Sequence, residues 1–458
     1  MFEFSNQNRN KDVLVTGLGL VTPLGCSANA TWNAMLAGHR AGRSLTRDDI
    51  DHFDQLSAME GLALQGAAVD FATVAMRLEC SQLLETVPAN ASGVWRSEPM
   101  VAMSLVALAE AMSHAGLRCS DLKPERTAVV FGSSKGGLRS TEWLAEALAA
   151  RRTLKLQMAT VGTGDDAEER FSQPAIQLQN DSADLWNCGV QPDSATRAIT
   201  ALTGATIASS CPVAACATGL IAFLQGAAMI HRGECDVCIV GSADAGLRSS
   251  VLASFHRLRV TSRNRDAAAA CRPFDKSRDG FVVGEGAGLA VLESRAHATA
   301  RHAKAIARIV AGGWLNDPTG MTQVDESGAV VSEVLKRTMN LRGRSPDILS
   351  LHGTGTESND LAEARGIQMA FGANVPQCFG MKGSIGHLLG AAGSVETVLT
   401  LLALNHQQIP GTTNLTTVDE RCRIPLQPHA RKMPYMQKAA KLSLGFGGHV
   451  ACGVFVLD

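Results

Sequence analysis

The sequence predicts an α/β protein with largely parallel sheets, because short apolar runs alternate with helical patterns along the chain. The apolar runs have the length and composition of buried strands, and most stop at glycine: VLVTGLGLV, TAVVFGSS, VCIVGSADAG, GLAVLES, ILSLHGTGT and ACGVFVL. Stretches rich in alanine and leucine lie between them. Two of these stretches end at Gly116 and Gly233, and a glycine just past a periodic stretch marks a helix stop.

Chain length and composition favour a large globular protein of two parts. The chain has 458 residues, of which 45% are hydrophobic and 19% charged, and this length exceeds one average domain. A polar helical stretch from Ala296 to Ile309 separates two regions of strand–helix alternation, so we expect an N-terminal half over residues 11–299 and a C-terminal half over residues 300–458. Residues 43–100 and 150–195 show little periodicity, and the second segment is expected to form a surface excursion or flap.

Charge and hydropathy narrow the range of partners. The net charge is −1, which gives no reason to expect nucleic acid or an anionic membrane surface as a partner. The N-terminus is polar and no apolar run reaches about 18 residues, so neither a signal peptide nor a membrane span is expected.

The twelve cysteines are scattered along the chain. Cys235 and Cys238 form a CDVC pair, but this pair lies inside an apolar, strand-like run, and no second pair lies at zinc-binding spacing. We therefore expect no metal site and interpret the cysteines as small, reduced core residues. Reduced cysteines indicate a reducing compartment, so a cytoplasmic location is expected.

Cys216 is the candidate nucleophile. Residues before it are small and interrupted by Pro212, and an apolar helical pattern follows it. A cysteine at a helix N-terminus meets unpaired backbone N–H groups, which favour thiolate over thiol. The small residues from Ala215 to Gly219 are expected to let a substrate carbonyl approach. The alternatives are a buried structural thiol and Cys211 as nucleophile, although Pro212 favours an extended rather than a helix-initiating Cys211.

Two histidines lie downstream, where strands give way to turns or helices. HGTGTESND begins at His352, directly after the apolar run DILSL, and His387 precedes a glycine-rich helical stretch in KGSIGHLLGAAGSVE. α/β enzymes place their chemistry at such positions. A pair of imidazoles can hold a thioester carbonyl oxygen while negative charge builds toward an enolate. Taken singly, each histidine is also compatible with a structural role.

A glycine turn lies between two apolar runs in LSLGFGGHVACGVF, near the C-terminus. The backbone N–H groups of Gly445, Phe446 and Gly447 are candidates for an oxyanion hole. A plain hairpin turn is the alternative.

Together these windows resemble the β-ketoacyl synthases of the thiolase superfamily, especially the elongating type that uses one cysteine and two histidines. The likeness spans most of the chain and follows the family's order: VLVTGLGLVTPLG, ACATG, RPFDKSRDGFVVGEGAGLAVLE, HGTGT with ND, KGSIGHLLGAAGSVE and GFGGH. The resemblance implies a five-layered αβαβα thiolase-like fold of two related halves, usually assembled as a homodimer. It also favours functional roles for Cys216 and both histidines over structural ones.

The resemblance further implies roles for single residues. Cys216 matches the family's acylated cysteine, and His352 and His387 match the two histidines that support decarboxylation and condensation. Lys382 and Glu396 match a buried lysine and glutamate that orient the histidine region.

Other matches concern the substrate. Phe446 matches a gate residue whose backbone N–H joins that of Cys216 in the oxyanion hole, and Thr354 and Thr356 match threonines that contact the phosphopantetheine arm. The implied reaction is a decarboxylative Claisen condensation of a Cys216-bound acyl group with malonyl-acyl carrier protein (malonyl-ACP), in fatty-acid or polyketide synthesis. No cofactor is implied beyond the phosphopantetheine arm that the carrier protein delivers.

Four arginines form a candidate docking site for the acidic carrier protein. The stretch FHRLRVTSRNR contains Arg257, Arg259, Arg263 and Arg265. In the family, the corresponding segment lies near the mouth of the substrate tunnel. A solvated loop without a partner is the alternative.

The chain departs from the family pattern at several positions. Gly204-Ala205 stands where a Gly-Pro pair usually precedes the nucleophile, a few extra residues intervene before Cys216, and Leu444 replaces a common phenylalanine. Residues 43–100 and 150–195 match poorly, and these regions shape the acyl pocket and the dimer interface in the family. The sequence therefore predicts neither the acyl chain length nor the choice between fatty-acid and polyketide substrates.

Two other classes of protein compete with the condensing enzyme. Chain-length-factor-like partner subunits resemble synthases but lack the cysteine, so Cys216 argues against this class. Thiolases and chalcone synthases typically combine one histidine with a second cysteine or an asparagine, which the pairing of HGTGT with KGSIGH disfavours.

Overall fold

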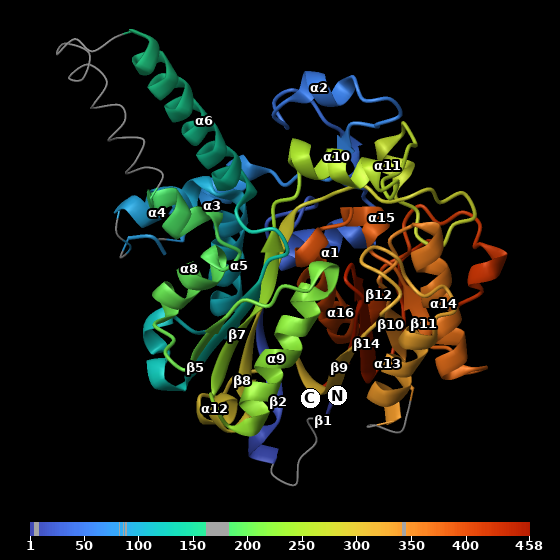
Figure 1. Ribbon diagram of the computed structural model, residues 1–458. Coiled ribbons are helices and arrows are strands. Elements are labelled where there is room, and N and C mark those ends of the chain that lie inside the picture. Colours follow the sequence, from blue (N-terminus) through green and yellow to red (C-terminus); the bar gives the residue numbers. More distant parts are fainter. Residues whose placement is uncertain (4–8, 82, 86, 88, 162–182, 341–344) are drawn as a thin grey trace.

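The computed structural model describes residues 1–3, 9–81, 83–85, 87, 89–161, 183–340 and 345–458. A large mixed sheet runs through this part of the chain (Figure 1). Its strands lie in the order β11 (Gln377–Phe379), β10 (Ile348–Ser350), β14 (Lys438–Gly445), β15 (His449–Val456), β9 (Ala307–Asn316), β2 (Val13–Val21), β8 (Gly286–Ser294), β7 (Val237–Asp244), β5 (Thr127–Gly132) and β6 (Ala208–Ser210). The short strand β1 (Phe2–Glu3) pairs with β9. Two separate two-stranded sheets are formed by β3 (Arg43–Ser44) with β4 (Gln65–Gly66) and by β12 (Gln408–Ile409) with β13 (Arg431–Lys432).

Helices cover the outer faces of the sheet, and two more helices, α9 (Thr218–Arg232) and α16 (Ala392–His406), lie between its two halves. The α-helices are α1 (Ala28–Leu36), α2 (Phe53–Ser57), α3 (Phe71–Cys80), α4 (Ala89–Ser97), α5 (Pro99–Ala115), α6 (Leu138–Val161), α8 (Ser194–Thr203), α9 (Thr218–Arg232), α10 (Ser249–Arg257), α11 (Ala267–Ala270), α12 (Arg295–Ala300), α13 (Ala329–Asn340), α14 (Glu357–Phe371), α15 (Lys382–Ile385) and α16 (Ala392–His406). The short helical turns are η1 (Arg9–Lys11), η2 (Cys119–Asp121), η3 (Pro124–Arg126), η4 (Trp186–Val190), η5 (Ala215–Ala217), η6 (Leu389–Ala391) and η7 (Glu420–Cys422).

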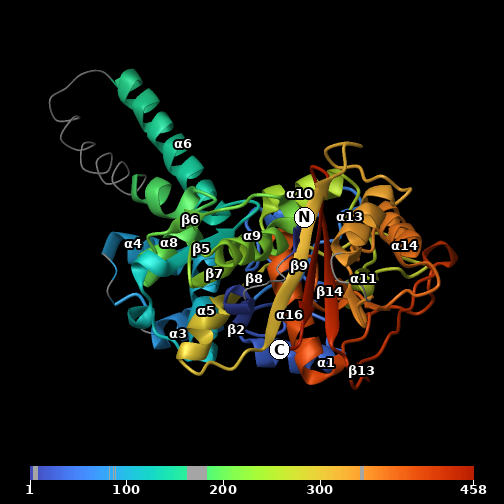
Figure 2. The ribbon, with the colours of Figure 1, turned by 90° about the horizontal axis from the view of Figure 1, so that it is seen from below.

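The elements form five layers, which confirms the αβαβα expectation (Figures 1 and 2). On one outer side α5 packs on β2 and β8, and α8 packs on β5. The middle layer contains α9 and α16, which pack on each other and on strands of both sheet halves. On the other outer side α13 packs on β9 and β15, with α14 beside it. Each outer helical layer packs on the sheet through its own hydrophobic cluster, and a third cluster surrounds the middle helices on both sides.

The central helices are apolar on nearly all faces because a sheet half lies on each side of them. α5 and α9 both end where the sequence indicated, at glycines in the left-handed region: Gly116 has φ 65° and Gly233 has φ 80°. Glycine has no Cβ atom and adopts this conformation readily, so these two residues terminate the helices.

The expectation of largely parallel sheets is wrong. β5 runs parallel to β6 and β7, and β10 runs parallel to β11 and β14. However, β8 is antiparallel to β2 and β7, and β15 is antiparallel to β9 and β14. Helices cover both faces of the sheet, so central strands such as β2, β7 and β8 are buried along their whole length, and their composition carries no information about direction.

The poorly matched segments have different structures. Residues 43–100 form β3, β4, α2, α3 and α4, and Val74, Leu78 and Trp95 join the hydrophobic cluster around α5. In the segment 150–195, α6 projects away from the body of the protein up to Val161, and η4 leads into α8 (Figures 1 and 2). Residues 162–182 of the expected flap lie outside the described residues.

The polar stretch expected to divide the chain forms α12 and the start of β9. Among the described residues, no helix combines the length and the apolar character that crossing a membrane requires.

Candidate active site

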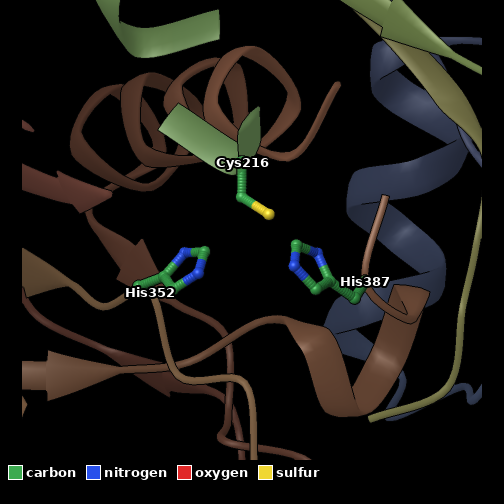
Figure 3. A group of neighbouring side chains, drawn as sticks. All are labelled: Cys216, His352 and His387. Carbon is green, nitrogen blue, oxygen red and sulfur yellow. The ribbon is translucent and has the colours of Figure 1, made fainter. Parts of the chain in front are cut away.

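Three of the predicted site residues meet at the centre of the molecule. Cys216 lies in η5, directly before α9, while His352 follows β10 and His387 follows α15. The sulfur of Cys216 points between the two imidazole rings (Figure 3), and a side-chain nitrogen or sulfur atom of each residue lies within 4.8 Å of those of the other two. The two rings are 5.5 Å apart between centroids and nearly perpendicular, at 82°. The fold therefore brings Cys216 together with two histidines that are more than 130 positions away from it in the sequence.

A strained turn presents Cys216 to the histidines. Ala215 has φ 47°, a left-handed conformation that is uncommon for a residue with a Cβ atom. The hydroxyl of Thr218 accepts a hydrogen bond from the Ala214 N–H at 2.8 Å and so fixes the turn. The positive φ of Ala215 could not be predicted from the sequence, because alanine is not a residue type that favours this conformation.

The small residues after Cys216 have a different purpose from the one expected. Ala217 and Thr218 are fully buried, and a Cβ atom on Gly219 would lie 2.1 Å from the Ser394 backbone nitrogen. These residues therefore allow α9 to contact α16 closely.

Cys211 is not part of this group. Its side chain is only partly buried, and its Sγ lies 3.4 Å from the carbonyl oxygen of Pro192. The structure therefore separates the two candidate cysteines, and only Cys216 faces the histidines.

A buried network of charges holds His352. The Lys382 ammonium lies 3.2 Å from Nδ1 of His352 and 2.7 Å from Oε1 of Glu396. Behind the histidine, the Glu363 carboxylate accepts hydrogen bonds from the backbone N–H groups of His352, at 2.5 Å, and Gly353, at 2.8 Å. Burial raises the pKa of Glu363 to about 7.

The sequence analysis found Lys382 and Glu396 but missed two other buried charged residues, Glu363 and Lys441. Lys441 lies on β14, and its ammonium is 2.7 Å from Oε2 of Glu396. The available signal was a lysine inside an otherwise apolar, strand-like run, AAKLSLG.

The hydrogen bonds define the protonation of both imidazoles. An ammonium group can only donate, so Nδ1 of His352 accepts from Lys382. Nδ1 of His387 accepts from the Leu389 N–H at 3.3 Å. Burial, together with the positive charge of Lys382, holds the pKa of both histidines well below its usual value. Each imidazole is therefore neutral and carries its proton on Nε2, from where it can donate.

The thiol of Cys216 is less acidic than expected at a helix start. Burial raises its pKa to about 11, and the positive charges of Lys382 and Lys135 act in the opposite direction without overcoming it. Lys135 was not identified from the sequence. It follows β5, and its ammonium lies 5.7 Å from the ring centroid of Phe255. The expectation of a thiolate in the resting protein is therefore not supported, because removal from water raises the pKa of this thiol.

A cavity of about 420 Å³ leads to the three residues. Its lining includes Cys216, both histidines, Leu444 and Phe446, together with Thr354 and Thr356, whose hydroxyls are 2.8 Å apart. The predicted arm-binding threonines and the predicted gate thus share one cavity with the thiol. A larger hollow of about 670 Å³ is lined by charged residues such as Arg43, Asp49 and Glu285, and none of its described lining residues is a cysteine or histidine.

The glycine turn contributes fewer free N–H groups than expected. A Cβ atom on Gly445 would lie 3.1 Å from the Cys216 nitrogen, so this turn packs directly against the nucleophile. The Gly447 N–H donates to the Met321 carbonyl at 2.7 Å and is therefore not available to an oxyanion. Cys216 and Phe446 remain as the candidate pair.

One of the four arginines, Arg259, lines this cavity. Arg257 ends α10, and Arg263 and Arg265 follow in the next loop. All four are exposed, and none forms an ion pair with a described residue.

The donor atoms of Cys216, His352 and His387 are of the kinds that zinc binds. The fixed ammonium groups of Lys382 and Lys441 beside them disfavour a divalent cation at this point. The CDVC cysteines, Cys235 and Cys238, are fully buried on and beside β7.

The comparisons with known proteins place the chain among the condensing enzymes, which are acyltransferases. The family model described as beta-ketoacyl synthase, N-terminal domain, matches residues 10–298, and that for the C-terminal domain matches residues 306–416. The chain therefore belongs to the β-ketoacyl synthase family, as the order of its motifs indicated.

Relatives and solved structures agree with this assignment. The 3-oxoacyl-[acyl-carrier-protein] synthase 2 of Vibrio cholerae is 32% identical over 95% of this chain and 96% of its own length. That of Staphylococcus aureus is 29% identical over 98% and 99%. The fold matches a beta-ketoacyl synthase from Burkholderia phymatum with a TM-score of 0.73, at 24% identity over 98% of this chain and 99% of that one. It also matches a ketosynthase in complex with its type II polyketide acyl-carrier protein, with a TM-score of 0.79 at 24% identity and the same coverage.

Proposed function

We propose that the protein condenses an acyl group on Cys216 with malonyl-ACP, releasing CO₂ and forming a β-ketoacyl-ACP. One observation carries this proposal. A thiol faces two neutral imidazoles, both with a proton on Nε2, at the floor of a cavity that extends to exposed residues such as Arg259.

The first step is transfer of the acyl group to Cys216. Sulfur attacks the thioester carbonyl, the bond to the pantetheine sulfur breaks, and the Cys216 proton passes to the departing thiolate. The N–H groups of Cys216 and Phe446 are proposed to bind the developing oxyanion. Because burial raises the pKa of the Cys216 thiol to about 11, its proton is present in the resting protein and must move during this step.

The second step uses the histidines. The malonyl thioester oxygen accepts hydrogen bonds from Nε2–H of His352 and of His387, and the electrons of the breaking C–C bond pass into an enolate as CO₂ leaves. The enolate carbon then attacks the acyl carbonyl on Cys216. That attack forms the new C–C bond, and collapse of the tetrahedral intermediate restores the carbonyl and breaks the C–S bond, expelling the Cys216 thiolate, which takes up a proton.

The carrier protein is the proposed partner. Its phosphopantetheine arm would lie along Thr354 and Thr356, and no other cofactor is needed for these steps. An acidic carrier would meet positive charge from Arg259 at the cavity and from three exposed arginines near it in the sequence: Arg257, Arg263 and Arg265.

A homodimer is proposed on the side of β6. This strand is one of the two edges of the sheet in the described part of the chain, and Ile207 and Val213, which flank it, are 39% and 56% exposed. An open strand edge with apolar neighbours is typical of a surface that pairs with another chain. Light scattering of the purified protein tests this assembly.

Two further proposals concern location and organisation. A cytoplasmic location is supported by the twelve cysteines, all of which are free thiols. A division into halves at residues 11–299 and 300–458 is supported by α12, which lies at the boundary and carries neither the nucleophile nor a histidine of the site.

A chain-length-factor-like subunit is not better supported, because such subunits lack the cysteine that faces the histidines here. The decisive experiment is intact-mass spectrometry after incubation with a panel of acyl-ACPs, from short to long fatty acyl groups and oxygen-rich polyketide intermediates. Wild type and Cys211→Ala are expected to gain the acyl mass, and Cys216→Ala is not. Absence of acylation with every donor would contradict the proposed function, while the most reactive donor identifies the pathway.

A further inference from the structure

Lys441 is a second lysine at the floor of the site, and nothing in the proposed reaction assigns it a role. Its side chain is 0% exposed, and three oxygen atoms surround its ammonium. These are Oε2 of Glu396 at 2.7 Å, the Leu442 carbonyl at 2.7 Å and the Leu351 carbonyl at 2.8 Å. A fully buried lysine is costly to hold unless it is paired, so this arrangement is a built feature of the site and not a surface accident.

The two carboxylate oxygens of Glu396 each face a different lysine. Oε1 is 2.7 Å from Lys382 and Oε2 is 2.7 Å from Lys441. Lys382 continues to Nδ1 of His352. Lys441 thus fixes the far side of the carboxylate that holds the lysine behind His352.

Lys441 also holds the backbone that carries His352. In the parallel pairing of β10 and β14, Ser350 is the register partner of Lys441. The Lys441 ammonium therefore reaches the carbonyl of the next residue, Leu351, which directly precedes His352. The histidine is approached from two directions, through its ring by Lys382 and through its backbone by Lys441.

Four buried ionisable groups lie around His352. Lys382 and Lys441 contribute two positive charges, Glu396 between them contributes one negative charge, and burial raises the pKa of Glu363, behind the histidine, to about 7. The positive charge of Lys441 also helps to hold the pKa of both histidines below its usual value, after burial and Lys382. An excess of positive charge behind the imidazoles favours their neutral, donating form.

We infer that Lys441 is a positioning residue for the malonyl step, which fixes Glu396 and the Leu351 backbone so that Nε2–H of His352 stays directed at the thioester oxygen. The inference rests on the proposed condensing function. It does not give Lys441 any contact with substrate, and acyl transfer to Cys216 needs no such alignment of His352.

The test compares the two half-reactions in Lys441→Met, which keeps an unbranched side chain of similar size and removes its charge. In this variant the positive charge of Lys382 still neutralises the negative charge of Glu396. We expect malonyl-ACP decarboxylation to fall about a hundredfold, the size of effect that a misplaced catalytic group produces. Acylation of Cys216, followed by intact mass, is expected to stay within about twofold of wild type. The acid limb of the decarboxylation profile should move to higher pH, because His352 becomes easier to protonate.

A matched control is Lys438→Met, on the same strand but outside the site, for which neither half-reaction should change. Equal loss of both half-reactions in Lys441→Met would make Lys441 a residue of the fold alone, and unchanged decarboxylation would overturn the inference. Lys441→Ala with methylammonium in the buffer provides a second variant, and recovery of decarboxylation on adding the amine is expected. If wild type itself does not decarboxylate malonyl-ACP, the proposed function fails and not the assignment of Lys441.

Discussion

The charged residues at the floor of the cavity are buried and paired, whereas the arginines at its rim are exposed and unpaired among the described residues. At the floor, the side chains of Lys382, Glu396 and Lys441 are at most 1% exposed, and each lysine ammonium lies 2.7 Å from a carboxylate oxygen of Glu396. At the rim, Arg257 and Arg259 are exposed and have no ionic partner among the described residues. Fixed, desolvated charges act strongly over short distances, whereas exposed charges act over about 10 Å at 0.1 M salt and are screened beyond it.

This difference divides the expected effects of substitutions. Changes at the floor should alter the bond-making steps and respond little to salt. Changes at the rim should alter the encounter with the carrier protein and respond strongly to salt. Each prediction below either separates the two regions further or shows that they are not separate.

The largest effect is expected at Cys216. Cys216→Ala should lower condensation by roughly four orders of magnitude or more, as loss of a nucleophile does in other covalent enzymes. Malonyl-ACP decarboxylation should persist, because both imidazoles remain. In wild type, epoxides of the cerulenin type should alkylate Cys216. Separate assays of β-keto product and CO₂ distinguish these outcomes, and loss of acylation in Cys211→Ala with retention in Cys216→Ala would reverse the assignment.

The histidines come next. His352→Ala and His387→Ala should each slow the malonyl step by about 10²–10⁴-fold, the range for loss of an oxyanion donor or an acid–base group. Acylation of Cys216 should suffer less, because the proposed oxyanion hole for that step is made of backbone N–H groups. The measurement is the rate of decarboxylation beside the rate of mass gain. Decarboxylation near the wild-type rate in both variants would exclude the role proposed for them.

The pH dependence of the malonyl step follows from the burial of His352 and His387. A free histidine protonates near pH 6.5, but burial, together with the charge of Lys382, holds the pKa of His352 and His387 well below that value. The neutral forms therefore persist as pH falls through 6.5, and decarboxylation by Cys216→Ala should stay constant there. The rate should fall only at lower pH, where the folded protein takes up the proton. A half-maximal rate at or above pH 6.5 would contradict this.

The sequence was informative where local pattern determines structure. The strands that became β2, β7 and β8, and the glycines that end α5 and α9, could be predicted because burial and helix termination depend on nearby residues. The three site residues could be found because their motifs follow the order of a known family. Strand direction could not be predicted, since helices cover both faces of every central strand.

Other features of the site depend on distant parts of the chain. Lys441 meets the Leu351 carbonyl because β14 pairs with β10, 90 residues away in sequence. Gly447 loses its free N–H to Met321, which belongs to a loop that carries no motif. The raised pKa of Cys216 comes from burial by several elements at once, which a helix-start argument based on adjacent residues does not include.

The smallest effect is expected at the rim, and it gives the clearest separation from the floor. Reversing charge in Arg257→Glu with Arg259→Glu should raise the apparent KM for acyl-ACP about tenfold at low salt, because steering of an acidic partner is lost. Reaction with small acyl-pantetheine thioesters should be almost unchanged, since these carry no acidic surface. Added salt should raise the wild-type KM toward that of the variant. Arg118→Glu, at an exposed arginine that already pairs with Asp121, serves as a control for total charge. If both substrates lose activity equally, the arginines support the fold or the site, and the rim is energetically part of the floor.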